Sequence, residues 1–296
     1  MNRLFLYSGL LFILILIFDT YDRDYNQTMI VPDPIIENES AINTKQPPQT
    51  DSVRSAKSEK VQPRLKSVDT LESNKLIIKY DTNSGELLYS ELKDYAVDLG
   101  SDEKIIILDY EKKKYSATSN IQLLNTDIYP VYNKKNSSRI NTVVLESTNI
   151  AGVTLTKEIT LLDDTHQIAI RNTIKNNSTK SIDVRNYETI SRDDNNTASI
   201  MLPTYTGSAY YDEENKFSKL SFEDIIDNSQ TVKTQSSWIS MIEHYFFSAW
   251  LPTSSNKKTI YTSHNQDVYT IGSSTDYSQV PPVSYTHLTL PTKQAV

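Results

Sequence analysis

Apolar and polar residues alternate along much of this chain, which is the pattern of β-strands with one buried face. The segment from Val153 to Ile159 shows it most clearly. Val153, Leu155, Lys157 and Ile159 occupy one side, and two threonines and a glutamate occupy the other. We therefore predict that this segment is a half-buried strand.

Similar short segments recur along the chain, separated by turns rich in Asn, Asp, Ser and Gly. Two of them flank the turn Asn83-Ser84-Gly85 and predict a hairpin. Strands at this spacing indicate a mainly β fold, an antiparallel sandwich or barrel, rather than alternating strand–helix units. The predicted strands are Lys75–Tyr80, Glu86–Tyr89, Ile105–Leu108, Asn141–Glu146, Val153–Leu162, Gln167–Lys175 and Ser181–Tyr187.

One segment, residues 236–252, concentrates the large apolar side chains. It holds both tryptophans and a Tyr-Phe-Phe triplet, and it ends at Pro252. Trp238, Met241 and Tyr245 fit one face of a helix, whereas the residues that follow alternate as in a strand. We predict a deeply buried element in which a short helical turn leads into a strand.

The N-terminus carries an apolar run from Leu4 to Phe18, with Arg3 before it and acidic residues after it. As a helix, fifteen residues span about 22 Å, and the flanking residues 2–21 bring the length close to the ~30 Å of a hydrocarbon core. The alternative is a cleaved signal peptide, but no small-x-small cleavage site follows Phe18. We predict an uncleaved transmembrane anchor, residues 1–21, with its N-terminus in the cytoplasm.

Residues 22–70 change in composition to Pro, Ser, Gln, Asn and mixed charges, without a sustained apolar period. Such a segment buries too little apolar surface to offset its ordering entropy. We predict a disordered tether with an end-to-end distance on the order of 40 Å. The β-rich domain then occupies residues 71–282.

Composition narrows the function. The chain has 296 residues, a net charge of −7 and no cysteine. Mild acidity argues against nucleic-acid binding, and the absence of cysteine excludes disulfides and thiolate metal sites. No phosphate-binding G-x-x-x-x-G-K-[ST] loop and no H-E-x-x-H motif occurs, so we predict no cofactor, no metal and no catalytic residue.

Several motifs resemble one known family. Trp238, Met241, Tyr245-Phe246, Ala249-Trp250 and Pro252 follow the spacing W-x-x-M-x-x-x-Y-F-x-x-A-W-x-P, which resembles the large periplasmic domain of YidC, the bacterial membrane protein insertase. The resemblance covers roughly residues 1 to 280. Further matching segments are Gly152–Leu161, His166–Asn177 and Gly207–Tyr211 followed by Phe222.

The resemblance implies an antiparallel β-supersandwich, similar to galactose mutarotase, in the periplasm of a bacterium and anchored in the inner membrane. It implies part of an insertase that aids insertion and folding of inner-membrane proteins, alone or with the Sec translocon. The five-helix insertase core lies outside this chain. Implied partners are the inner membrane, nascent membrane proteins, and the translocon with its accessory subunits. Tyr210, Tyr211 and Phe222 are the candidate partner contacts, with a place in the core as the alternative.

Residues 283–296 depart from the family pattern. The string Val283 to Val296 resembles translated sequencing adapter at the broken end of a gene fragment. We predict that this tail is not native.

Two other functions remain open. A mutarotase-like, sugar-binding or sugar-epimerising protein would need a histidine and a carboxylate converging on a sugar. The candidates are His166, His244 or His264 with Glu188, Glu243 or Asp267. A self-contained periplasmic interaction domain is the other alternative. We expect an accessory, non-enzymatic role.

Overall fold

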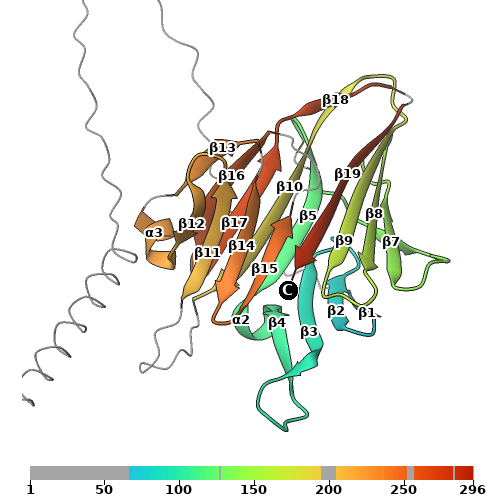
Figure 1. Ribbon diagram of the computed structural model, residues 1–296. Helices are drawn as coiled ribbons and strands as arrows, with labels where there is room; N and C mark the ends of the chain where they lie inside the picture. Colours follow the sequence, from blue (N-terminus) through green and yellow to red (C-terminus); the bar gives the residue numbers. More distant parts are fainter. Residues whose placement is uncertain are drawn as a thin grey trace, which may run out of the picture. The chain divides into compact units, whose positions relative to one another are not determined.

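Antiparallel strands build most of the chain (Figure 1). The computed structural model describes residues 67–126, 128–194, 205–227, 229–235, 237–251, 257–282 and 284–295. Within these ranges the strands form two sheets, and every strand pairing is antiparallel. The predicted mainly β, antiparallel fold is therefore confirmed.

The first sheet is the larger of the two. Its order is β1 (Val68–Glu72), β2 (Leu76–Asp81), β3 (Leu87–Ala96), β5 (Ser116–Leu123), β10 (Ile182–Asp193), β17 (Val268–Thr275), β16 (Lys258–Asn265) and β13 (Thr231–Thr234), with β4 (Lys104–Asp109) beside β3 and β18 (Ser278–Val280) beside β10.

The second sheet has the order β12 (Lys216–Leu220), β11 (Thr206–Asp212), β14 (Trp238–Glu243), β15 (Phe246–Leu251), β19 (Ser284–Ala295), β9 (Ile168–Asn176), β8 (Val153–Leu161), β7 (Thr142–Ser147) and β6 (Asn133–Lys135). Two short helices, α2 (Tyr110–Lys113) and α3 (Phe222–Asp227), connect strands.

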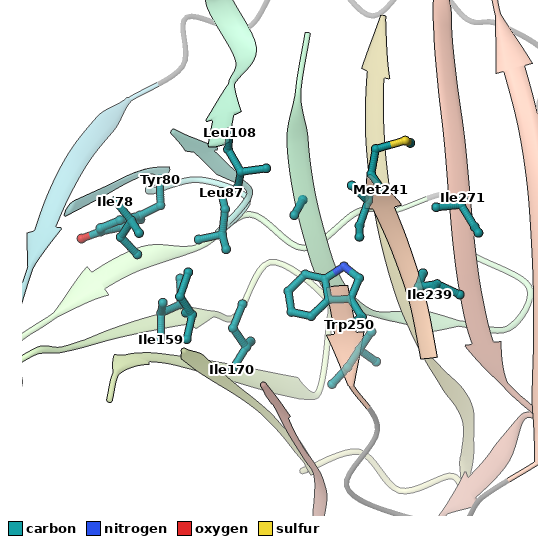
Figure 2. Packing of buried hydrophobic residues seen from close by; sticks show 14 of the residues in the cluster. Ile78, Tyr80, Leu87, Leu108, Ile159, Ile170, Ile239, Met241, Trp250 and Ile271 are labelled. Carbon is teal, nitrogen blue, oxygen red and sulfur yellow. The ribbon is translucent and has the colours of Figure 1, made fainter. Parts of the chain in front are cut away.

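The core lies between the two sheets (Figure 2). Ile271 of the first sheet and Ile159, Ile170 and Trp250 of the second are all buried in it. Trp250 also bridges the sheets, because its indole Nε1 donates a hydrogen bond to the carbonyl of Thr189 at 2.9 Å. A buried tryptophan needs such a partner for its N–H group.

The strands expected from alternation are confirmed. β8 alternates buried and partly buried residues along its whole length. The predicted hairpin is β2–β3, and its turn contains Gly85 at φ +70°. Glycine suits this turn, because other residues rarely adopt positive φ.

The helical turn predicted before the Trp-rich strand is wrong. The structure has a hairpin here, in which β14 and β15 are joined by a turn at His244 (φ +53°) and Tyr245. Ile239, Met241 and Trp250 are buried, but Tyr245 is 85% exposed and Phe247 is 46% exposed. β14 pairs with β11, and β15 pairs with β19, so the backbone hydrogen-bonding groups on both outer sides of the hairpin have partners. These pairings favour strands over the helical turn that the sequence pattern suggested.

The anchor 1–21 and the tether up to residue 66 lie outside the described residues. β1 begins at Val68, slightly ahead of the predicted domain boundary. Among the residues that the structure describes, no helix is long and apolar enough to cross a membrane. Residues 284–295 form β19, which pairs with β9 and β15. The non-native origin of this tail stays a prediction.

Candidate functional site

Three aromatic side chains lie in a row across one end of the second sheet. Tyr211 of β11 is directly opposite Phe217 of β12 on one side and Trp238 of β14 on the other. The rings of Tyr211 and Trp238 stack at 6.3 Å between centroids, and those of Phe217 and Trp238 lie 5.8 Å apart. Phe217 is 49% exposed, and the other two are partly exposed. We call these three residues the aromatic surface.

Lysines border the aromatic surface. The Lys216 ammonium lies 6.0 Å from the Tyr211 ring, and the Lys219 ammonium lies 6.0 Å from the Phe217 ring and 4.8 Å from that of Tyr205. Cations at these distances are attracted to the ring faces. The surface thus combines apolar ring faces with two lysines, and the exposed Glu213 and Glu214 in the β11–β12 turn add negative charge beside them.

β12 is the last strand on its side of the second sheet within the described part of the chain. An edge strand offers backbone donors and acceptors to an extended peptide, whereas lysines on an edge discourage non-specific pairing. The arrangement suits an extended polypeptide partner with apolar side chains.

The three predicted contact residues fall in different places. Tyr210 and Phe222 are each only 5% exposed, so both are core residues. Phe222 stacks on Tyr269 at 4.5 Å between ring centroids. Tyr211 alone of the three belongs to the aromatic surface. Neighbouring residues of a strand face opposite sides, which separates Tyr210 from Tyr211. Trp238 lies beside Tyr211 because of the register between β14 and β11. The sequence pattern of one strand does not reveal which residue of another strand it faces.

A buried polar network lies between the sheets. Glu188 of β10 is fully buried, and its carboxylate accepts hydrogen bonds from Asn186 (2.6 Å) and Ser273 (2.7 Å). The ammonium of Lys258, also buried, lies 3.3 Å from the same carboxylate. Asn172 of the second sheet donates to Asn186 at 3.2 Å and so connects the two sheets. These bonds satisfy most of the buried polar atoms of the network, although the Oδ1 atom of Asn172 accepts no hydrogen bond.

A second charged cluster lies where α2 meets the sheets. The guanidinium of Arg192, fully buried, is 3.3 Å from the Glu243 carboxylate, and Lys113 bonds the other oxygen of Glu243 at 2.5 Å. The Arg192 guanidinium also lies 5.2 Å from the Tyr115 ring. The cluster ties the first sheet, the second sheet and α2 together.

The structure places the three histidines of the alternative sugar site in separate parts of the fold. His166 lies beside Asp94, with 3.8 Å between Nε2 and the carboxylate, and His244 is in the β14–β15 turn. His264 is opposite Tyr269, further along the first sheet from Ser273, which bonds Glu188. The three histidines therefore belong to three separate turns and strand ends.

Comparison with known proteins assigns the family. A family model described as the YidC periplasmic domain matches residues 70–291. The chain belongs to this family. The resemblance seen in the Trp-rich segment is thereby confirmed.

Curated relatives agree with this assignment. The protein named membrane protein insertase YidC from Haemophilus ducreyi is 27% identical over 299 residues, covering 97% of this chain and 54% of that protein. The relative of the same name from Actinobacillus succinogenes is 28% identical over 284 residues, covering 92% and 51%. The chain thus spans about half the length of the curated YidC relatives it matches.

Solved structures show a distant likeness. A galactose mutarotase related enzyme from Lactobacillus acidophilus covers 77% of this chain and 96% of its own, with a TM-score of 0.49 and 7% identity. A galactose mutarotase-like protein from Lactobacillus casei covers 77% and 99%, with a TM-score of 0.49 and 9% identity. A likeness this remote gives no support to sugar binding or epimerisation by the YidC domain.

Proposed function

We propose that this chain is the N-terminal, accessory part of a membrane protein insertase. It aids the insertion and folding of inner-membrane proteins, alone or with the Sec translocon, and it carries the periplasmic domain and not the insertase core. The observation that supports this most strongly is the match of residues 70–291 to the YidC periplasmic domain. The curated relatives from Haemophilus ducreyi, Mannheimia succiniciproducens and Actinobacillus pleuropneumoniae are each named membrane protein insertase YidC.

The proposal includes a topology. Residues 2–21 anchor the chain in the bacterial inner membrane with the N-terminus in the cytoplasm, and residues 22–70 tether the periplasmic domain. The apolar run Leu4–Phe18, preceded by Arg3, supports this orientation. The domain is a β-supersandwich without enzymatic activity, and residues 283–296 are a non-native tail.

The proposed role of the domain is to hold partners near the insertase core. The aromatic surface, with Tyr211 at its centre, contacts the accessory subunits of the translocon or nascent membrane proteins. Partly exposed aromatic rings flanked by Lys216 and Lys219 support this assignment, because aromatic residues dominate binding energy at protein interfaces.

Reading the source gene through codon 282 and onward tests the insertase assignment first. We expect the frame to continue into a membrane core with about five spans of ~20 residues each. The full-length product should then restore growth to a bacterial strain depleted of its own insertase. A genuine stop codon after residue 296, or a full-length product that restores no growth, would refute the proposal.

Site-specific photo-cross-linking tests the aromatic surface. A benzophenone amino acid replaces Phe217 in full-length protein, and the matched control carries it at Tyr129, which is 73% exposed. We expect cross-links to translocon subunits or nascent chains from position 217 only, and their loss when Tyr211 is changed to Ser. Equal cross-linking from both positions would exclude a specific role for this surface.

A further inference from the structure

One end of the domain presents exposed apolar side chains on projecting turns. β3 pairs with β5 only at Leu87 and Ala117, so β3 and β4 continue beyond the end of β5 as a hairpin (Figure 1). Leu99, at the tip of this hairpin, is fully exposed, and Val97 is 47% exposed. We call residues 97–103 the hairpin tip.

The hairpin tip is an ordered turn. The Val97 amide donates to the carbonyl of Glu103 at 2.9 Å, and the Ser101 amide donates to the carbonyl of Asp98 at 3.0 Å. Gly100, at φ +84°, occupies the turn position that requires positive φ. The turn therefore holds Leu99 outward at its apex, and little backbone ordering is left to oppose binding.

Further apolar side chains lie at the same end. Tyr95, at the base of the hairpin, contacts Phe246 with 6.0 Å between ring centroids. Phe246 follows the β14–β15 turn, which exposes 85% of Tyr245 and 46% of Phe247. Exposed tyrosines at the same end of a domain as a projecting apolar tip suit contact with a membrane interface, because one end of the ring is apolar and the other is polar.

We propose that the hairpin tip inserts Leu99 and Val97 into the interface of a zwitterionic lipid surface. Leu99 and Val97 on a convex turn supply too little area for a stable protein interface, which needs about 800 Å² per partner, whereas binding at a lipid interface scales with whatever apolar area is buried. The inference rests on the proposed function, since the anchor and tether keep lipid within reach of the domain.

The charge of the hairpin tip selects the kind of lipid. The hairpin tip carries three acidic residues, Asp98, Asp102 and Glu103, and the nearest cation that follows them in the sequence is Lys104 at the start of β4. Anionic headgroups would repel this cluster within a Debye length of the surface. The contact is therefore with zwitterionic headgroups and weakens as anionic lipid is added.

The chain contains no cysteine, so a single introduced cysteine carries a unique label. Ser101→Cys, labelled with an environment-sensitive fluorophore, reports the hairpin tip. The control label is at Ile128→Cys, which is 54% exposed in the loop after β5, at the opposite end of that strand from α2. Both labelled 296-residue chains are reconstituted through their N-terminal run into phosphatidylcholine vesicles that contain doxyl-labelled lipid.

We expect lipid quenching at position 101 and none at position 128. Adding Leu99→Asp to the Ser101→Cys chain should reduce lipid contact about tenfold, and adding Ile128→Asp should not. Replacing part of the phosphatidylcholine by phosphatidylglycerol should lower the quenching at position 101. Because Leu99 is fully exposed, the urea unfolding midpoint should stay unchanged, which excludes misfolding as the cause.

Equal quenching at the two positions, or no effect of Leu99→Asp, would overturn the proposal. The proposal would also be overturned if the label at position 101 became shielded with rising protein concentration and not with lipid. That result would assign the hairpin tip to a contact with a second copy or another protein. The insertase assignment is tested separately by growth of the depleted strain. If the depleted strain grows but the label at position 101 shows no lipid quenching, only the proposed lipid contact is refuted and the insertase assignment stands.

Discussion

Replacing Lys157 by methionine tests how the buried face of β8 affects stability. Lys157 is fully buried, and burial lowers its pKa from 10.5 to about 7, although Glu86 and Asp81 act in the opposite direction. Its ammonium donates to the carbonyl of Ser84 at 2.8 Å. An unfolded chain, by contrast, keeps this lysine charged up to its ordinary pKa.

The sign of the pH dependence follows from this difference. Between pH 7 and pH 10.5 the unfolded chain binds more protons than the folded one, so the free energy of unfolding rises with pH. Below pH 7 the cost of burying the charged lysine is present in full. With a folded pKa of about 7, raising the pH from 7 to 9 should add about 2 kcal/mol. Lys157→Met should abolish this gain.

Urea unfolding followed by tryptophan fluorescence at pH 7, 8 and 9 measures the effect. The upper limit avoids the buried tyrosines, because burial raises the pKa of Tyr115 and Tyr187, and ionisation in the unfolded state then costs stability above pH 10. The matched control is Lys180→Met, which removes the same charge at an exposed position. Parallel pH profiles for the wild type and Lys157→Met would refute the reasoning.

Three further predictions concern packing and buried charge, and the same unfolding experiment tests each of them. Gly85→Ala should lower the free energy of unfolding more than Gly100→Ala, although the positive φ at each position costs an alanine about 1 kcal/mol. At Gly85 the new Cβ would lie 2.5 Å from the buried lysine of β8, whereas at Gly100 it would meet nothing within 4 Å. Equal losses would contradict this. Trp250→Ala should cost about 3–5 kcal/mol through lost burial and a lost hydrogen bond, and a loss below about 1 kcal/mol would show that the site is not core. Glu188→Gln should cost about 3–5 kcal/mol by leaving the buried ammonium of Lys258 without its charge partner, and adding Lys258→Met should recover most of the loss; no recovery would argue against a paired charge.

Alternation predicted strands well where apolar residues mark the buried face. β8 and β9 are such strands. No strand was predicted for β5, because its buried positions include Ser116, Ser119 and Asn120 instead of large apolar residues. The buried hydroxyl of Ser119 is satisfied, because it accepts a hydrogen bond from Asn172 across the sandwich. A polar residue that is satisfied by a distant partner resembles a loop residue in the sequence.

The aromatic residues show the same limit. Large apolar content in the Trp-rich segment predicted burial, and it is correct for Trp250 and wrong for Tyr245. Among the candidate contacts, Tyr211 is partly exposed while Tyr210 is buried. Exposure at these positions depends on which strands pair and which face the other sheet covers.

By itself the sequence determined the mainly β class, the positions of several strands, the Gly85 turn and the family, because period-two patterns, turn residues and motif spacing are local properties. Only the tertiary structure decided the order of the strands, the aromatic surface, the exposed hairpin tip and the low pKa of Lys157. Those features arise between residues far apart in the chain: Lys157 and Ser84 are bonded across 73 positions. The register and packing of two sheets set such contacts, and no single strand encodes them.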